Sequence, residues 1–130
     1  MTQSLPKAFG FDVFGTVVDW RSGVIRDVCR FLSDIDRPDV KADEFADAWR
    51  RRYLDVMGAY GRSGRAFVTL DILHREMLDG TLDAYAIDQT TIAPSAIDDL
   101  NRAWHRLDAW PDAAAGIARL RAWLRPSPCR

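Results

Sequence analysis

Apolar residues recur through most of the chain at three- and four-residue intervals, which is the spacing of amphipathic helices. This pattern predicts helices after Ser22, over about 41–60, up to Gly80, from Pro94 and Ser95 onward, and after Pro111. The apolar stripes that define these helices are Val24, Val28, Phe31 and Leu32; Phe45, Trp49, Tyr53 and Val56; Phe67, Leu70, Leu73 and Met77; Ile97, Leu100, Trp104 and Leu107; and Ile117, Leu120 and Leu124. Polar, glycine- or proline-containing segments at 34–40 and 61–65 separate the early helices.

Local signals predict where these helices begin and end. Ser22 can cap the first helix, and Gly80 can end the third. Ser95 and Asp98 have the spacing of a capping box, although the acidic residue is Asp rather than Glu. Pro111 suits the start of the last helix.

One short segment, AFGFDV at residues 8–13, has the apolar and aromatic composition of a buried strand. A buried strand needs neighbours that satisfy its backbone N–H and C=O groups, and the rest of the sequence predicts no second strand. Two readings therefore stay open: the segment is not a strand, or part of its domain lies outside these residues.

Composition narrows the classes of partner. The chain has 130 residues, of which 48% are hydrophobic and 28% charged, as expected for a globular domain. A formal net charge of −1 argues against nucleic-acid binding driven by bulk charge. No apolar stretch reaches the roughly 18 residues that a membrane-spanning helix needs. Cys29 and Cys129 have no metal-binding spacing, so a reduced cytoplasmic location is the default expectation.

The candidate chemistry begins with Asp12, which ends the apolar segment and precedes a Gly15–Thr16 turn. Ligands of α/β folds bind outside the carboxyl ends of strands, so a carboxylate there is a candidate functional group. The alternative is an aspartate that only accepts turn N–H groups. His74 and His105 have no partners at a catalytic or metal-binding spacing and are predicted to be packing or surface residues.

Three stretches resemble one family when they are taken together. FDVFGTVVDWRS (residues 11–22) resembles the first motif of the haloacid dehalogenase superfamily, in particular its type II L-2-haloacid dehalogenases. AWRRRYL (48–54) resembles the cap-domain helix that carries an arginine on the substrate side, and AWHRLDAWPDAAAGIARLRA (103–122) resembles the helical return from cap to core.

The resemblance implies a haloacid dehalogenase-like α/β fold, a Rossmann-like core with a helical cap, here represented mostly by the cap and the first core strand. It implies that residues 1–20 are the first strand and nucleophile turn, 21–94 the helical cap, and 95–124 helices returning to the core, followed by a non-periodic tail at 125–130.

The resemblance also implies a reaction, the hydrolysis of (S)-2-haloacids to 2-hydroxyacids. Asp12 is then the nucleophile that forms an aspartyl ester, and Thr16 orients the Asp12 carboxylate through a hydrogen bond. Arg50 meets the substrate or the departing halide, and Phe67 lines an apolar halide pocket.

Phe14 separates this reaction from that of the related phosphatases, which typically carry a second aspartate at that position as a general acid. Halide is a weak base that leaves without a proton, so an aromatic residue there shapes the substrate pocket instead. The resemblance therefore implies a small 2-haloalkanoic acid as the substrate, with no metal and no cofactor, and disfavours a phosphatase.

Later family motifs cannot be placed in these residues: a Ser-Asn pair, a lysine near the nucleophile, and the Asn and Asp group that activates water. A truncated chain or a changed reading frame is one interpretation, and an ordinary frayed terminus is the other. The alternative functions are a catalytically incomplete fragment and a helical interaction module. We expect weak activity from the chain alone, and homodimerisation or other self-association through its unpaired segment.

Overall fold

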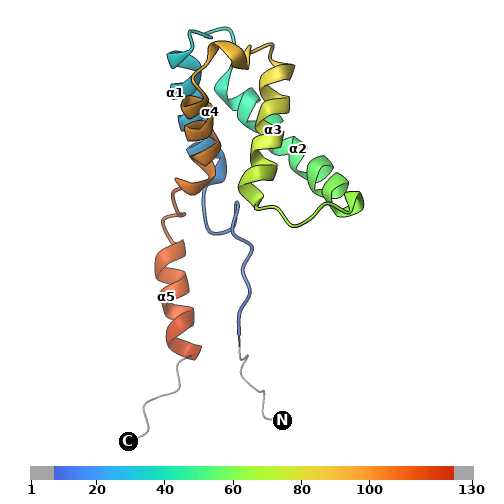
Figure 1. Cartoon of the computed structure of the whole chain (residues 1–130). Helices are drawn as coiled ribbons and strands as arrows, with labels where there is room; N and C mark the ends of the chain where they lie inside the picture. The colour runs from blue at the N-terminus through green and yellow to red at the C-terminus, as the bar shows by residue number, and fades with distance from the viewer. Residues whose placement is uncertain (1–7, 125–130) are drawn as a thin grey trace, which may run out of the picture. The chain divides into compact units, whose positions relative to one another are not determined.

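The computed structural model describes residues 8–124, and the tail predicted at 125–130 lies outside them. Its α-helices are α1 (Trp20–Asp34), α2 (Ala42–Ser63), α3 (Leu70–Ala84), α4 (Pro94–Asn101) and α5 (Ala113–Leu124). Short 3-10 helices, η1 (Gln89–Thr91) and η2 (Arg102–His105), precede and follow α4 (Figure 1). The predicted succession of helices is therefore confirmed. In the described part of the chain no helix has the length and apolar character needed to span a membrane.

The predicted strand at 8–13 does not form. Pairing of the β type within residues 8–124 is limited to isolated bridges, Phe14 with Val18 and Val18 with Ala109. The segment is drawn in Figure 1 as an extended trace, blue, without an arrow. A strand exists only as part of a ladder, and the described residues contain no neighbouring strand to complete one.

The chain forms two compact units. Unit 1 consists of residues 1–20 and 108–130, and unit 2 consists of residues 21–107. The fourth helix, predicted to belong to the segment that returns to the core, lies in unit 2. The domain bounds drawn from the resemblance, which divide the chain by role, stay a prediction.

Unit 2 is built around the predicted apolar stripes. Helix α3 packs along α2, and α4 lies beside α1, where Arg30 of α1 binds Asp99 of α4 at 3.1 Å (Figure 1). Seventeen apolar side chains are buried in the described chain, the largest of them Trp49, Phe45, Met77 and Leu78, and all seventeen lie in this unit. Burial of each large side chain stabilises the fold by about 1.5–3 kcal/mol, so the helix stripes supply most of the core. Phe67, predicted on the stripe of the third helix, instead precedes α3 and is 88% exposed.

A buried ion-pair network joins the helices α1 and α4. The Asp27 carboxylate is only 2% exposed and accepts hydrogen bonds from Arg26 Nε at 3.2 Å and Arg106 Nε at 2.9 Å. Arg106 also donates to Asp99 Oδ1 at 2.9 Å. A buried carboxylate requires such partners, because its desolvation is otherwise unfavourable by several kcal/mol.

Two of the predicted helix caps were wrong, although the predicted start of α4 at Pro94 is confirmed. Helix α1 begins at Trp20, so Ser22 lies inside its first turn. Helix α4 begins at Pro94 after Ala93, and the cap position makes no side-chain hydrogen bond. The Asp98 carboxylate, predicted to close a capping box, instead pairs with Arg75 of α3. Tertiary ion pairing therefore replaced the predicted local cap.

Helix α3 continues through Gly80, where the sequence predicted its end. A Cβ at this position would lie 2.9 Å from Arg52 Nη1, which is the far end of a flexible side chain on α2. The helix ends where Ala86 adopts φ 51° and the Ile87 N–H donates to Leu82 O at 3.0 Å. The left-handed conformation of Ala86 turns the chain so that a following N–H reaches a terminal carbonyl of the helix. The sequence had predicted a glycine, Gly80, in this helix-ending position.

Candidate functional site

The predicted nucleophile motif forms a tight turn in unit 1. The N–H groups of Val17 and Val18 donate to Val13 O at 2.9 and 3.1 Å, and Gly15 N–H donates to Val18 O at 2.9 Å. Gly15 has φ 93°, a left-handed conformation that is strained for residues with a Cβ. Glycine is therefore required at this position by the backbone conformation of the turn.

The turn is held in place by the segment that precedes α5. Asp19 N–H donates to Asp108 O at 2.9 Å, and Trp110 N–H donates to Val17 O at 3.0 Å. The Trp110 indole Nε1 also donates to Gly15 O at 3.0 Å. The sequence pattern did not predict this supporting role of Trp110, because the contact spans 95 residues of sequence.

Asp12 and Thr16 meet across the turn. The Thr16 hydroxyl donates to Asp12 Oδ2 at 2.9 Å, and both residues are solvent-exposed. This hydrogen bond engages one carboxylate oxygen and fixes the orientation of the group. Phe14, between them in sequence, is half-buried and contributes no ionisable group beside the carboxylate. An oriented carboxylate in this position has the chemistry of a nucleophile.

The other predicted site residues lie in unit 2. Arg50 is half-buried on α2, and its guanidinium carbon lies 4.4 Å from the centroid of the Tyr53 ring. Phe67 lies in the segment that joins α2 to α3, and its side chain is 88% exposed. That segment is held near Phe67 on both sides, because the Tyr60 hydroxyl donates to Ala66 O at 3.4 Å and accepts from Val68 N–H at 3.3 Å.

The prediction that the two histidines are packing or surface residues is confirmed. His74 is 4% exposed, and its ring stacks at 4.8 Å on that of Trp104. Burial lowers the pKa of His74 from 6.5 to about 4, aided by the charges of Arg50 and His105 and opposed by that of Asp71. His105 is exposed and pairs with Asp71 at 2.8 Å.

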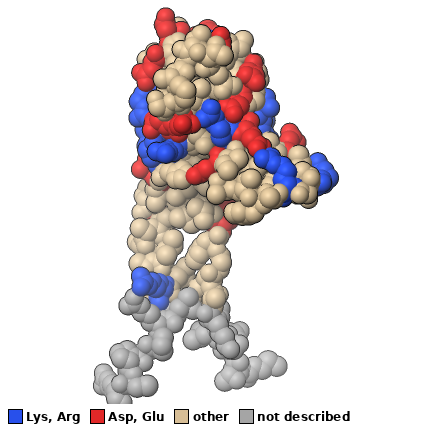
Figure 2. Space-filling view, viewed as in Figure 1, with Lys and Arg blue, Asp and Glu red and all other residues tan. Residues whose placement is uncertain are grey.

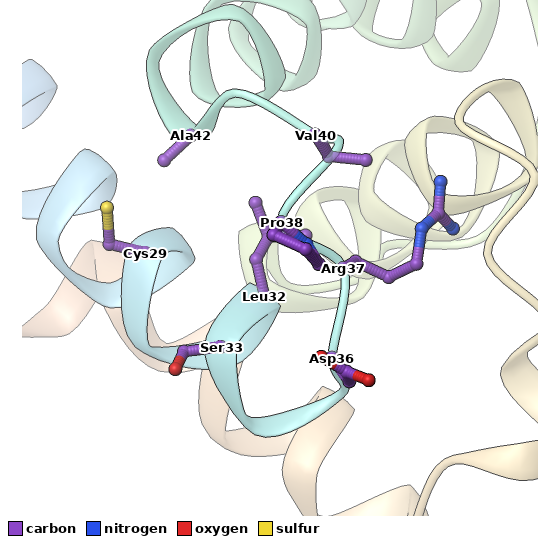
Figure 3. A pocket seen from close by; sticks show the side chains of 8 residues that line it. All are labelled: Cys29, Leu32, Ser33, Asp36, Arg37, Pro38, Val40 and Ala42. Atoms are coloured by element: carbon purple, nitrogen blue, oxygen red, sulfur yellow. The ribbon is translucent and has the colours of Figure 1, made fainter.

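A hollow of about 280 Å³ lies elsewhere in unit 2, beyond the C-terminal end of α1 (Figure 3). Its lining residues are Cys29, Leu32, Ser33, Asp36, Arg37, Pro38, Val40 and Ala42. None of them is a predicted site residue. Among residues 8–124 no group of three or more His, Cys, Asp or Glu side chains has the arrangement of a metal site, and the expected independence of metal stays a prediction.

Comparison with known proteins gives a consistent answer. The curated (S)-2-haloacid dehalogenase 1 of Pseudomonas sp. (strain CBS-3) is 28% identical over 116 residues, which cover 89% of this chain and 46% of that protein. The crystal structure of a defluorinating L-2-haloacid dehalogenase matches 85% of this chain and 45% of its own, with 46% identity and a TM-score of 0.81. Both comparisons point to the L-2-haloacid dehalogenases.

Further dehalogenase structures agree. A second L-2-haloacid dehalogenase is 31% identical with a TM-score of 0.73, covering 85% of this chain and 46% of its own. The L-2-haloacid dehalogenase of Xanthobacter autotrophicus is 25% identical with a TM-score of 0.64, and the match covers 84% of this chain and 40% of that enzyme. No family model matches the chain.

The haloacid dehalogenase-like fold predicted from the motifs is confirmed, and the described part of it is mostly helical. The chain spans just under half the length of the dehalogenases described above. The activity of those whole proteins is therefore a proposal for this chain.

Proposed function

We propose that this chain provides the nucleophile and a substrate-binding arginine for the hydrolytic dehalogenation of (S)-2-haloacids to 2-hydroxyacids. The single observation that carries the proposal is the hydrogen bond of 2.9 Å between the Thr16 hydroxyl and Asp12 Oδ2. This bond sits in the one segment whose order of residues resembles the dehalogenase nucleophile motif, and the dehalogenase relatives support the same reaction class.

The reaction has two steps. With Oδ2 engaged by Thr16, Asp12 Oδ1 attacks C2 of the haloacid, a C–O bond forms, and the C–halogen bond breaks with its electron pair leaving as halide. Water then adds to the Cγ carbonyl of the aspartyl ester. The ester bond to the substrate breaks, which releases the 2-hydroxyacid and a proton and regenerates the carboxylate.

Phe14 distinguishes this reaction from phosphoryl transfer. A phosphatase must protonate an alkoxide leaving group, and the position two residues after Asp12 would supply that acid. Phe14 has no proton to donate, whereas halide departs without one. The same difference underlies our proposal that the reaction requires no metal and no cofactor, since no phosphate charge has to be neutralised.

Arg50 and Phe67 complete the proposed set. Arg50 carries a permanent positive charge suited to the carboxylate of the substrate or to the departing halide. Phe67 offers an exposed apolar ring for contact with the halogen or the alkyl chain. The substrate class is therefore a small 2-haloalkanoic acid.

A second candidate function is a helical interaction module. It is favoured by the exposure of large apolar side chains in unit 2, with Leu54 79% exposed and Phe67 88% exposed. Exposed apolar side chains of this size would contribute to a contact with a protein partner or a second copy.

The test is a chimera in which residues 1–124 of this chain are joined to the remaining part of the 46%-identical structural relative. We expect chloride release from (S)-2-chloropropionate and little from the (R) form, with Asp12→Asn reducing the rate by at least about a thousandfold. Asp112→Asn, an exposed carboxylate of the same unit, is the matched control and should leave the rate unchanged.

Circular dichroism and gel filtration establish that each chimera is folded. A folded chimera that releases chloride equally well with Asp12→Asn would overturn the role of Asp12. Hydrolysis of phenyl phosphate without chloride release would instead support the disfavoured phosphatase.

A further inference from the structure

The guanidinium of Arg50 lies over an aromatic ring supplied by its own helix. Tyr53 follows Arg50 by three residues on α2, so the two side chains share one face of the helix. The distance of 4.4 Å from Arg50 Cζ to the ring centroid is within the range of cation–π attraction. Both residues are half-buried, which strengthens such an interaction relative to a fully hydrated pair.

The Tyr53 ring is itself supported by a buried aromatic cluster. The ring of His74 on α3 lies 6.4 Å from that of Tyr53, centroid to centroid, and 4.8 Å from that of Trp104. Trp104 meets Trp49 edge-on at 5.4 Å, and Trp49 Nε1 donates to His74 O at 3.1 Å. Because these neighbours are packed into the core of unit 2, they hold the Tyr53 ring in place beneath Arg50.

The ring of His74 adds no positive charge beside Arg50. Burial lowers the pKa of His74 to about 4, and the charge of Arg50 contributes to the same effect. The ring of His74 is therefore neutral at physiological pH and brings no second positive charge. Arg50 therefore does not face a positive charge on the ring of His74.

The neighbouring arginines show that this arrangement is specific to one position. Arg51 is exposed, and the Arg52 guanidinium lies against Gly80 of α3, where a Cβ would be 2.9 Å from Nη1. Arg50 is the member of the run whose guanidinium stands over Tyr53. Three consecutive arginines therefore have three different environments.

We propose that Tyr53 is a positioning residue for Arg50, with its ring fixing the guanidinium for a small monoanion such as a carboxylate or a halide. This inference rests on the proposed function, in which Arg50 meets the haloacid. Tyr53 acts through its ring face and not through its hydroxyl, so phenylalanine should replace it and leucine should not.

The first experiment uses the whole chain and needs no activity. In NMR spectra, the Tyr53 ring should shift the side-chain proton signals of Arg50 upfield. Tyr53→Leu should abolish this shift and Tyr53→Phe should preserve it. Tyr60→Leu is the matched control, because it removes a second ring on α2, 6.0 Å from Arg65, and should leave the Arg50 signals unchanged. Arg50 signals without an upfield shift in the unsubstituted chain would overturn the proposal.

The second experiment titrates the same samples with sodium bromide and, separately, with sodium lactate, and follows the Arg50 signals. We expect Tyr53→Leu to weaken anion binding about fivefold, the equivalent of about 1 kcal/mol, and Tyr53→Phe to stay within about twofold of the unsubstituted chain. Arg50→Gln should abolish saturable binding. The two salts distinguish a halide site from a carboxylate site.

The outcomes separate this inference from the proposed function. Saturable binding that Tyr53→Leu leaves unchanged overturns the positioning role of Tyr53 and leaves the role of Arg50 intact. An intact upfield shift without saturable binding of either anion overturns the role of Arg50, and this inference with it. Loss of binding in Tyr60→Leu as well would show a general effect of the helix and would overturn a specific role for Tyr53.

Discussion

The two units of the chain are stabilised by different kinds of interaction. Unit 2 has an apolar core made by its helices, and several of its large side chains, such as Trp49 and Phe45, are fully buried. Unit 1 is held in its described part mainly by backbone hydrogen bonds around the turn at 13–18. Its large apolar side chains are substantially exposed, among them Phe9, Phe11, Val13, Trp110, Ile117 and Trp123.

The surfaces of the units differ in the same way. Basic and acidic side chains are interspersed over unit 2, whereas the visible surface of unit 1 is mostly uncharged (Figure 2). Asp12, the proposed nucleophile, lies in unit 1, whereas all seventeen buried apolar side chains of the described residues lie in unit 2. The comparison teaches that Asp12 can be oriented by the hydrogen bonds of a turn and of Thr16, whereas the environment of Arg50 depends on packed helices.

The largest expected effect is the loss of a core aromatic residue from unit 2. Trp49→Ala removes a fully buried ring and its hydrogen bond to His74 O, so we expect a destabilisation of about 3–5 kcal/mol. Phe11→Ala in unit 1 is the matched change, since this ring is 47% exposed and should contribute much less. Urea unfolding followed by tryptophan fluorescence and circular dichroism measures both, and equal effects would contradict the contrast between the units.

The buried ion-pair network of unit 2 should give the next largest effect. Arg106→Met leaves the Asp27 carboxylate, which is 2% exposed, without its strongest partner and should destabilise the unit by about 2–3 kcal/mol. Lys41→Met, in an exposed pair with Glu44, is the control and should leave the unfolding midpoint unchanged. The double variant Asp27→Leu with Arg106→Met should recover stability, and failure to recover would point to lost packing instead.

The pH dependence of unit 2 should report on His74. Its pKa is lowered to about 4 in the folded state from 6.5, so the unfolded chain binds more protons between these values. This contribution to stability is therefore complete above about pH 6.5 and decreases by about 3 kcal/mol as the pH falls to 4. His74→Phe should remove this part of the pH dependence of the free energy of unfolding, measured by urea titration at several pH values. An unchanged pH dependence would assign it to other groups.

The smallest effect is expected in the turn of unit 1. Gly15→Ala forces a Cβ into φ 93° and should destabilise the turn locally by about 1 kcal/mol. Hydrogen exchange at the amides of Val17 and Val18, which donate to Val13 O, should accelerate while the helices of unit 2 stay protected. Gly10→Ala is the control, because no atom lies within 4 Å of a Cβ there. Faster exchange throughout unit 2 would contradict the independence of the turn.

The helices were predictable because their apolar spacing is a local property, and Val24, Val28, Phe45 and Trp49 are buried as that spacing indicated. Their ends were less predictable. Gly80 carries the usual signal of a helix end but lies inside α3, because the left-handed turn that ends this helix forms at Ala86. The segment at 8–13 has strand composition without a strand, because pairing depends on partners that composition does not describe.

The Asp12 and Thr16 contact was implied by the family resemblance of the first motif, and it forms between residues four apart around a Gly-containing turn. The support of that turn by Trp110, the burial of Asp27 beside Arg106, and the separate environments of Arg50, Arg51 and Arg52 were not predicted. Each depends on residues distant in sequence, and in a run of identical side chains only the packing of neighbouring helices decides which one meets which partner. The sequence alone therefore determined the helical pattern and the local geometry of the candidate nucleophile, and the tertiary structure decided the surroundings of the arginine proposed to meet its substrate.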